Sequence, residues 1–171
     1  MLIAHLPVGV LSALCAERVL RAPLPKPAWV ALLLGSVAPD FDMIRFVVDG
    51  GRVHHHDYWS HRPLVWMALV ALSIGVVVLR RAPWRTSSAM LGVLFCSQGL
   101  LHLFLDTFQG QIAWGWPWRT AGAPWVHVDV VPGQHWVLTF VRHWFFQLEV
   151  LLIASAGWGL WRRRRYTTGQ P

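Results

Sequence analysis

A histidine and an aspartate one helical turn apart, His102 and Asp106, lie inside an otherwise apolar segment of this chain. On a helix, side chains four residues apart project from the same face. Ionisable groups inside a membrane segment are costly, and they usually pair with one another or with a bound ion. Imidazole nitrogen and carboxylate oxygen are both ligands of divalent transition metals, so this pair predicts one edge of a metal site.

Two more carboxylates follow a proline at the end of another apolar run. Asp40 and Asp42 come directly after Pro39. On a continuous helix, side chains two residues apart point about 200° away from each other, so these two would not share a site. Proline removes a backbone donor and disturbs the preceding turn, which would let both carboxylates turn inward. The alternative is that they only end the helix at the membrane surface.

The richest histidine cluster is the loop from His54 to His61, which reads His-His-His-Asp-Tyr-Trp-Ser-His. Neutral imidazole is a common metal ligand, and carboxylates complete or orient such ligands. Three adjacent histidines cannot all reach one ion, so we expect His56 and His61 to bind it. His54 or His55 would then face solvent, and Asp57 would orient a ligand.

Three residues are candidates for catalysis around such an ion. Arg62 could hold an anionic oxygen of a substrate, and Asp42 could assist the reacting group. Glu149 lies deep in the last apolar segment and needs a partner, for which Arg142, His143 and a polar group of the fourth expected span are candidates. Glu149 is either a ligand or a structural or proton-relay group. The candidate catalytic residues are therefore Asp42, Arg62 and Glu149.

The chain that must position these residues is too apolar for a water-soluble domain. Of its 171 residues 55% are hydrophobic and 13% charged, and the mean hydropathy is +0.43. Crossing a hydrocarbon core takes about 20 mostly apolar residues. We expect one all-α domain, residues 1–171, with a basic tail at 162–171. The expected membrane spans are 2–20, 28–48, 63–79, 88–108 and 136–161. The first lacks the basic start and cleavage site of a signal peptide, so we expect a mature helix.

The basic residues predict how the chain is oriented. They gather in three places, which are Arg18, Arg21 and Lys26, then Arg80, Arg81 and Arg85, then the arginines at 162–165. With five spans these clusters share one face, which the positive-inside rule makes cytoplasmic, C-terminus included. Nucleic-acid binding is not expected, because the +7 net charge lies at the ends of spans.

The opposite, extracytoplasmic ends of the spans collect nearly every histidine and most aspartates. These are His5, Asp40, Asp42, His54, His55, His56, His61, His102, Asp106, His127 and His135. His5 alone would more often be a packing residue than a ligand. Its convergence with the others on one level predicts a metal site near the outer membrane surface.

A long connection precedes the last expected span and is rich in tryptophan. It contains Trp114, Trp116, Trp118 and Trp125. Tryptophan favours the membrane–water boundary, so we expect this loop to lie in the outer headgroup layer. It is either an ordinary aromatic anchor or a surface that recognises a lipid or an amphiphile.

The ordered motifs carry a family resemblance that spans most of the chain. They are His5, Gly35-x-x-x-Pro39-Asp40-x-Asp42, His56-x-x-x-x-His61, His102-x-x-Leu105-Asp106-Thr107-x-x-Gly110 and Trp116-Pro117. This order resembles the YdjM family of membrane-bound metal-dependent hydrolases. The chain departs from the family at Asp57-Tyr58, where the family tends to have Arg-Gly, and at Arg62, where it tends to have Ser. A weaker likeness is to the zinc-dependent phospholipase C and P1 nuclease group.

The resemblance implies a bacterial inner-membrane hydrolase with a defined set of metal ligands. That set is His5, Asp40, Asp42, His56, His61, His102 and Asp106. Mixed nitrogen and oxygen ligands suit zinc, with manganese or iron as alternatives, and the set could hold one or two ions. Such an ion would lower the pKa of a bound water to near neutrality and polarise a scissile ester.

The sequence therefore predicts hydrolysis of a lipid-linked or amphiphilic ester, and a phosphoester is the favoured substrate. The alternative class is a non-enzymatic membrane metal-binding protein, either a metal carrier or a b-type haem protein. Haem would call for paired histidines and few carboxylates, so the abundance of aspartate favours hydrolysis.

Overall fold

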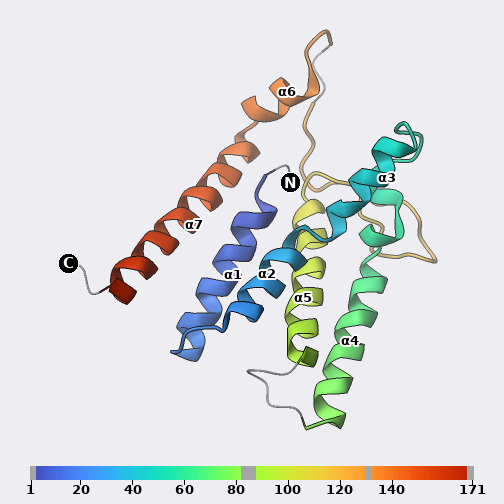
Figure 1. Cartoon of the computed structure of the whole chain (residues 1–171). Coiled ribbons are helices and arrows are strands. Elements are labelled where there is room, and N and C mark those ends of the chain that lie inside the picture. The colour runs from blue at the N-terminus through green and yellow to red at the C-terminus, as the bar shows by residue number, and fades with distance from the viewer. Residues whose placement is uncertain (1–2, 82–87, 130–131, 169–171) are drawn as a thin grey trace.

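The computed structural model describes residues 3–81, 88–129 and 132–168, and within these ranges the chain is all-α (Figure 1). Seven α-helices are joined by short 3-10 helices and loops. The α-helices are α1 (His5–Leu20), α2 (Lys26–Val37), α3 (Asp42–Val48), α4 (Pro63–Leu79), α5 (Ser88–Asp106), α6 (Trp136–Arg142) and α7 (Trp144–Thr168). The 3-10 helices are η1 (Pro39–Phe41), η2 (His55–Asp57) and η3 (Trp59–His61).

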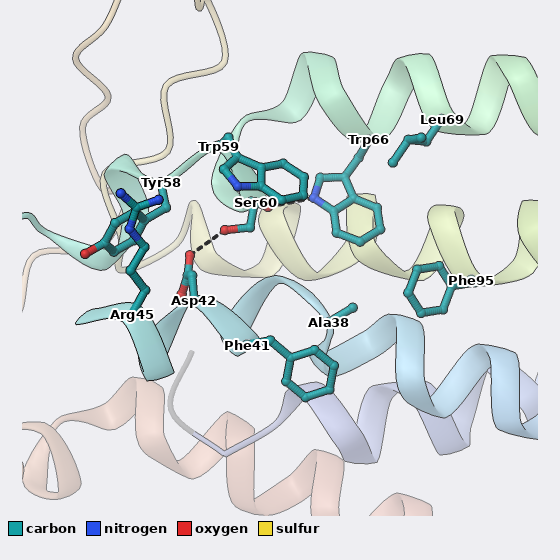
Figure 2. Close-up of a pocket in the computed structure, with 10 residues that line it drawn as sticks. All are labelled: Ala38, Phe41, Asp42, Arg45, Tyr58, Trp59, Ser60, Trp66, Leu69 and Phe95. Carbon is teal, nitrogen blue, oxygen red and sulfur yellow. Dashed lines mark hydrogen bonds between the residues drawn. The ribbon is translucent and has the colours of Figure 1, made fainter. Parts of the chain in front are cut away.

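Helix α5 forms the middle of the bundle, because both α2 and α4 pack along it, while α1 packs against α2 and α7. Glycines allow the close approach. A Cβ on Gly35 would collide with the backbone carbonyl of Phe95, and one on Gly99 would collide with the ring of Trp66. Trp66 of α4 and Phe95 of α5 face each other with ring centroids 5.9 Å apart (Figure 2). Small residues at such crossings are typical of packed membrane helices.

Two helices in the described part of the chain are long and apolar enough to cross a bilayer, at Ser88–Asp106 and Trp144–Arg165. The apolar helices Lys26–Val37 and Pro63–Leu79 are shorter. Large apolar side chains are widely exposed on the outer helices, for example Leu79 at 85% and Leu151 at 61%. Water-soluble monomers rarely expose apolar surface on this scale, whereas lipid-facing helices do. The expected number of five spans stays a prediction.

The described residues of the three basic clusters lie toward one end of the bundle. Arg18 is in the last turn of α1, and the chain reaches Arg80 at the end of α4, in the lower part of Figure 1. Near the end of α7, Arg163 forms an ion pair with Glu17 of α1, with Nε and Oε2 2.8 Å apart. Glu17 also accepts a hydrogen bond from the indole of Trp29. Arg85 lies outside the described residues.

The expected second span is interrupted where the sequence predicts a break. Helix α2 ends at Val37, and Pro39 begins the 3-10 turn η1 before α3 starts at Asp42. Because the turn at Pro39 leaves regular α-helical geometry, Asp40 and Asp42 are not constrained to opposite faces of one helix.

The expected last span at 136–161 is divided between two helices. Helix α6 ends at Arg142, His143 adopts an extended conformation, and α7 starts at Trp144. The Nδ1 atom of His143 accepts a hydrogen bond from the backbone N–H of Phe145. The histidine ring therefore satisfies an amide at the start of α7, as a capping side chain does, and this local bond competes with a continuous helix.

Candidate metal centre

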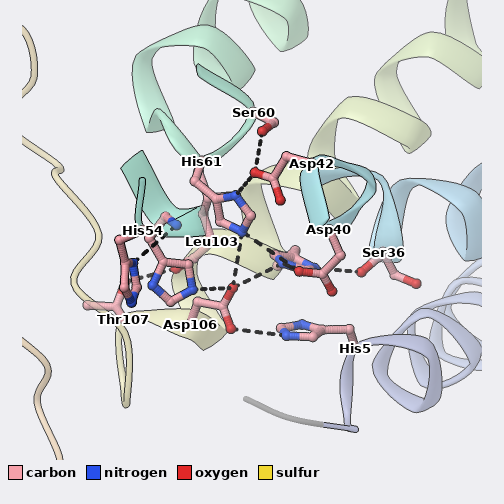
Figure 3. Close-up of polar contacts among 12 residues, drawn as sticks. His5, Ser36, Asp40, Asp42, His54, Ser60, His61, Leu103, Asp106 and Thr107 are labelled. Carbon is pink, nitrogen blue, oxygen red and sulfur yellow. Dashed lines mark hydrogen bonds and ion pairs between the residues drawn. The ribbon is translucent and has the colours of Figure 1, made fainter. Parts of the chain in front are cut away.

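The end of the bundle that is uppermost in Figure 1 gathers polar side chains from six secondary-structure elements (Figure 3). His5 comes from the first turn of α1, and Asp40 and Asp42 come from η1 and the start of α3. His61 ends η3, and His56 lies in η2. His102 and Asp106 come from the last turns of α5. Residues far apart in sequence thus meet in one cluster.

Four residues form the centre of this cluster. Asp40, His61, His102 and Asp106 each offer one ligand atom, and the four atoms lie within 4.8 Å of one another. His102 Nε2 is 3.0 Å from Asp106 Oδ2 and 3.4 Å from Asp40 Oδ1. His61 Nε2 is 3.7 Å and 3.8 Å from the same two oxygens. Ligand atoms around one tetrahedral zinc ion are separated by about 3.4 Å, given bonds of about 2.1 Å, so the residues fit such an ion.

The orientation of both imidazole rings is set by bonds on their far side. His61 Nδ1 lies 2.6 Å from Asp42 Oδ2, which also accepts a hydrogen bond from Ser60 Oγ. His102 Nδ1 lies 2.8 Å from the backbone carbonyl oxygen of Ser36. A carboxylate or carbonyl on one ring nitrogen makes it the donor and leaves the other nitrogen as the ligand, as in most protein metal sites.

The inward nitrogens have no hydrogen bond of their own. Neither His61 Nε2 nor His102 Nε2 forms one within the described part of the chain, although both atoms are buried and carboxylate oxygens are near. Buried polar atoms are normally hydrogen-bonded. Two such nitrogens converging on two carboxylates form the arrangement that a cation completes.

His5 and Asp106 extend the cluster toward α1. His5 Nε2 is 3.0 Å from Asp106 Oδ1, so each oxygen of this aspartate faces a histidine. The rings of His5 and His102 stack with centroids 3.7 Å apart. His5 therefore contacts the other oxygen of the Asp106 carboxylate and the ring of His102, and it is not one of the four central residues.

A second group of possible ligands consists of His55, His56 and His61. His56 Nε2 lies 3.7 Å from Asp106 Oδ2, which links this group to the first. One of His54 and His55 was expected to face solvent: His54 is exposed, whereas His55 is half-buried and belongs to this group. His54 instead accepts a hydrogen bond from the backbone N–H of His56 through Nδ1, which caps η2.

The pKa values of the histidines in this loop are shifted in different directions. Burial and the neighbouring His55 lower the pKa of His56 to about 2, so its ring is neutral, the form that binds metals. Burial and the neighbouring His61 also lower the pKa of His55. At His61, burial disfavours the charged ring, but the carboxylates of Asp106 and Asp42 outweigh it and raise the pKa. The centre therefore has a negative environment that attracts positive charge.

Two of the expected catalytic residues point elsewhere. Arg62 donates a hydrogen bond of 2.7 Å to the backbone carbonyl of Asp57, and its guanidinium lies 3.5 Å from the Asp57 carboxylate. Glu149 is fully buried and accepts a hydrogen bond of 2.7 Å from the backbone N–H of Ile3. Their catalytic roles stay predictions. Asp42, the third, lies beside the four central residues and contacts His61.

Several contributors were not identified from the sequence. They are the Ser36 carbonyl, the hydroxyl of Ser60, His55 and the space left by Gly110. A Cβ on Gly110 would collide with the ring of His56, so only glycine admits that ring. Gly110 was part of the motif order, and Ser60 directly precedes His61, but a backbone carbonyl contact has no mark in a sequence.

The model of the family described as YdjM inner membrane protein matches residues 1–167 of the chain. Searches of curated proteins and of solved structures return no match.

Proposed function

This chain belongs to the YdjM inner membrane protein family, and from that premise we propose that it is a membrane-bound, metal-dependent hydrolase. The observation that supports it best is the pair of buried nitrogens, His61 Nε2 and His102 Nε2, which form no hydrogen bond within the described residues. They lie 3.0–3.8 Å from oxygens of Asp40 and Asp106. A divalent cation is the group that two imidazoles and two carboxylates in this arrangement favour.

The residues of the site would have two roles, which are holding the ion and orienting its ligands. Asp40, His61, His102 and Asp106 would hold the ion, and Asp42 and the Ser36 carbonyl orient the two rings. Once bound, the ion supplies Lewis-acid chemistry, activating water and polarising the scissile group. The 3.0 Å contact between Asp106 Oδ1 and His5 Nε2 offers a route by which a proton leaves the centre.

Zinc suits this donor set best, and manganese and iron are the alternatives. The two groups of possible ligands share His61, whose Nδ1 is already engaged by Asp42. One ion in the four-residue centre is therefore the simplest occupancy. A second ion would use His55 and His56, and a measured stoichiometry of two ions per chain would assign it there.

We further propose five spans in one domain, with the C-terminus cytoplasmic and the centre facing the extracytoplasmic side of the inner membrane. The arginine-rich ends of α1 and α4 lie away from the histidine cluster, which supports this orientation. Trp118 and Trp125, exposed by 86% and 62%, belong to the loop that follows α5. A centre at that depth suits a lipid-linked or amphiphilic phosphoester.

The alternative is a membrane metal-binding protein without catalysis. A b-type haem would need two histidines on opposite sides of one iron. His5 and His102 are instead stacked face to face, beside three carboxylates, which favours a small ion over haem. A metal carrier is distinguished from a hydrolase by turnover.

The test combines metal analysis with hydrolysis. Protein purified in detergent is assayed for bound metals, scanned for a Soret band, and tested for release of phosphate from phosphatidic acid, before and after removal and return of zinc. We expect bound zinc, no Soret band, and turnover that is lost and regained with the ion. A strong Soret band, or full zinc without hydrolysis of any phosphoester supplied, would refute the hydrolase assignment.

A further inference from the structure

A cavity of about 470 Å³ lies beside the metal centre, between the α2–α3 segment, α4 and α5 (Figure 2). Its volume falls within the usual range of sites that bind small molecules. Most of its lining is apolar or aromatic, including Phe41, Trp59, Trp66, Leu69 and Phe95. The indole N–H of Trp66 is already donated to the Ser60 carbonyl, so its ring offers only apolar surface to the cavity.

One wall of the cavity is shared with the metal centre. Asp42 and Ser60 line the cavity, and the Asp42 oxygen bound by Ser60 is the one that lies 2.6 Å from His61 Nδ1. A single side chain therefore separates the cavity from a proposed metal ligand. The other oxygen of Asp42, Oδ1, is buried and forms no hydrogen bond within the described residues. A donor group on a bound molecule could satisfy it.

The positively charged side chain of Arg45 lies at another edge of the cavity. Arg45 lines it, and its guanidinium lies 5.2 Å from the centroid of the Tyr58 ring. Its partner in the chain is Asp49, four residues on, with Nε and Oδ2 3.3 Å apart. The Arg45 side chain is 66% exposed, and exposed pairs of this kind contribute little. Arg45 can therefore exchange Asp49 for an anionic head group, which it binds well.

We propose that this cavity binds the hydrocarbon chain of an anionic lipid, with the head group held between Arg45 and the wall formed by Asp42 and Ser60. The apolar lining would pack against the hydrocarbon chain of the lipid, and the Arg45 guanidinium would bind its anionic head group. The conclusion that the head group is then hydrolysed rests on the function proposed above. Binding of the lipid's hydrocarbon chain does not rest on that function, so lipid binding and hydrolysis can be tested separately.

The experiment measures lipid and metal on the same samples. Protein in detergent is titrated with oleoyl lysophosphatidic acid or with monooleoylglycerol, which has the same chain without the phosphate. Bound lipid is counted by native mass spectrometry, and zinc is measured by elemental analysis. The variant Leu69→Trp fills the cavity, and Leu79→Trp, at an 85% exposed position of the same helix, is the matched control. Arg45→Gln removes the charge.

We expect Leu69→Trp to weaken lysophosphatidic acid binding about tenfold, because the chain loses several buried methylene groups, while Leu79→Trp binds normally and both retain zinc. Arg45→Gln should lose the preference for lysophosphatidic acid over monooleoylglycerol. Equal binding by the wild type and Leu69→Trp would overturn the cavity assignment, and an unchanged preference in Arg45→Gln would overturn the head-group assignment.

A second cavity variant and a measurement of phosphate release distinguish the remaining explanations. If Leu69→Trp also loses zinc, Trp59→Ser decides, because its ring lines the cavity and is 67% exposed, so the fold tolerates its loss. Weaker lipid binding by Trp59→Ser supports the cavity, and unchanged binding overturns it. A wild-type protein that binds the lipid and zinc but releases no phosphate would refute hydrolysis and leave the lipid site standing.

Discussion

Asp42 and His61 are in close contact at the edge of the histidine cluster, with Oδ2 and Nδ1 2.6 Å apart. Asp42 begins α3 and His61 ends η3, so this bond ties two short segments together at the edge of the centre. It points the other nitrogen of His61 toward Asp40 and Asp106. The bond therefore couples the local fold to the proposed metal site.

Asp42→Asn should weaken zinc binding without removing a central ligand. The amide is a poorer acceptor for His61 Nδ1 than the carboxylate, and loss of such a supporting bond typically costs about 10- to 100-fold in metal affinity. The measurement is a zinc titration against a competing chelator. Asp49→Asn is the matched control, because Asp49 contacts Arg45 and Tyr58 instead. Equal affinities in the two variants would exclude an orienting role for Asp42.

Replacing either central residue of α5 should remove most of the metal. His102→Ala and Asp106→Ala each delete a ligand atom of the four-residue centre, and we expect zinc per chain to fall about tenfold or more with expression unchanged. The control is His127→Ala, since His127 is exposed in the loop after α5. Unchanged occupancy in the α5 variants would take this pair out of the site.

Gly35→Ala should destabilise the bundle. Its new Cβ would meet the carbonyl of Phe95, so α2 and α5 would have to separate, at a cost of about 1–3 kcal/mol. Thermal unfolding in detergent, followed by loss of the monodisperse peak, measures the change. Gly75→Ala in α4 is the control, because a Cβ there has no neighbour within 4 Å. Similar melting of both variants would mean that the α2–α5 contact does not limit stability.

A reporter fused after Arg165 should be cytoplasmic. The arginines near the end of α7 follow an apolar helix long enough to cross the bilayer, and positive charge is retained on the inner side. A green fluorescent protein fused there should fluoresce, and an alkaline phosphatase fused there should stay inactive. The reverse pair of results would invert the topology and place the metal centre on the cytoplasmic side.

The sequence by itself determined much of this protein's character. Apolar segments long enough to cross a membrane predicted the all-α fold, and the spacing of His102 and Asp106 placed both on one helical face. Pro39 predicted the break that lets Asp40 and Asp42 lie near the centre. These inferences succeed because proline chemistry and helical periodicity act over a few residues, whatever the rest of the chain does.

Only the tertiary structure decided which nitrogen of each ring faces inward. The Ser36 carbonyl orients His102 from 66 residues away in sequence, and a backbone oxygen carries no residue-specific mark. The same holds for Glu149, whose carboxylate accepts a hydrogen bond from the backbone N–H of Ile3, 146 residues away in sequence. His143 likewise caps α7 and breaks the last helix. Such contacts depend on how distant segments pack and on which local bond competes best, and residue type and spacing alone do not specify either.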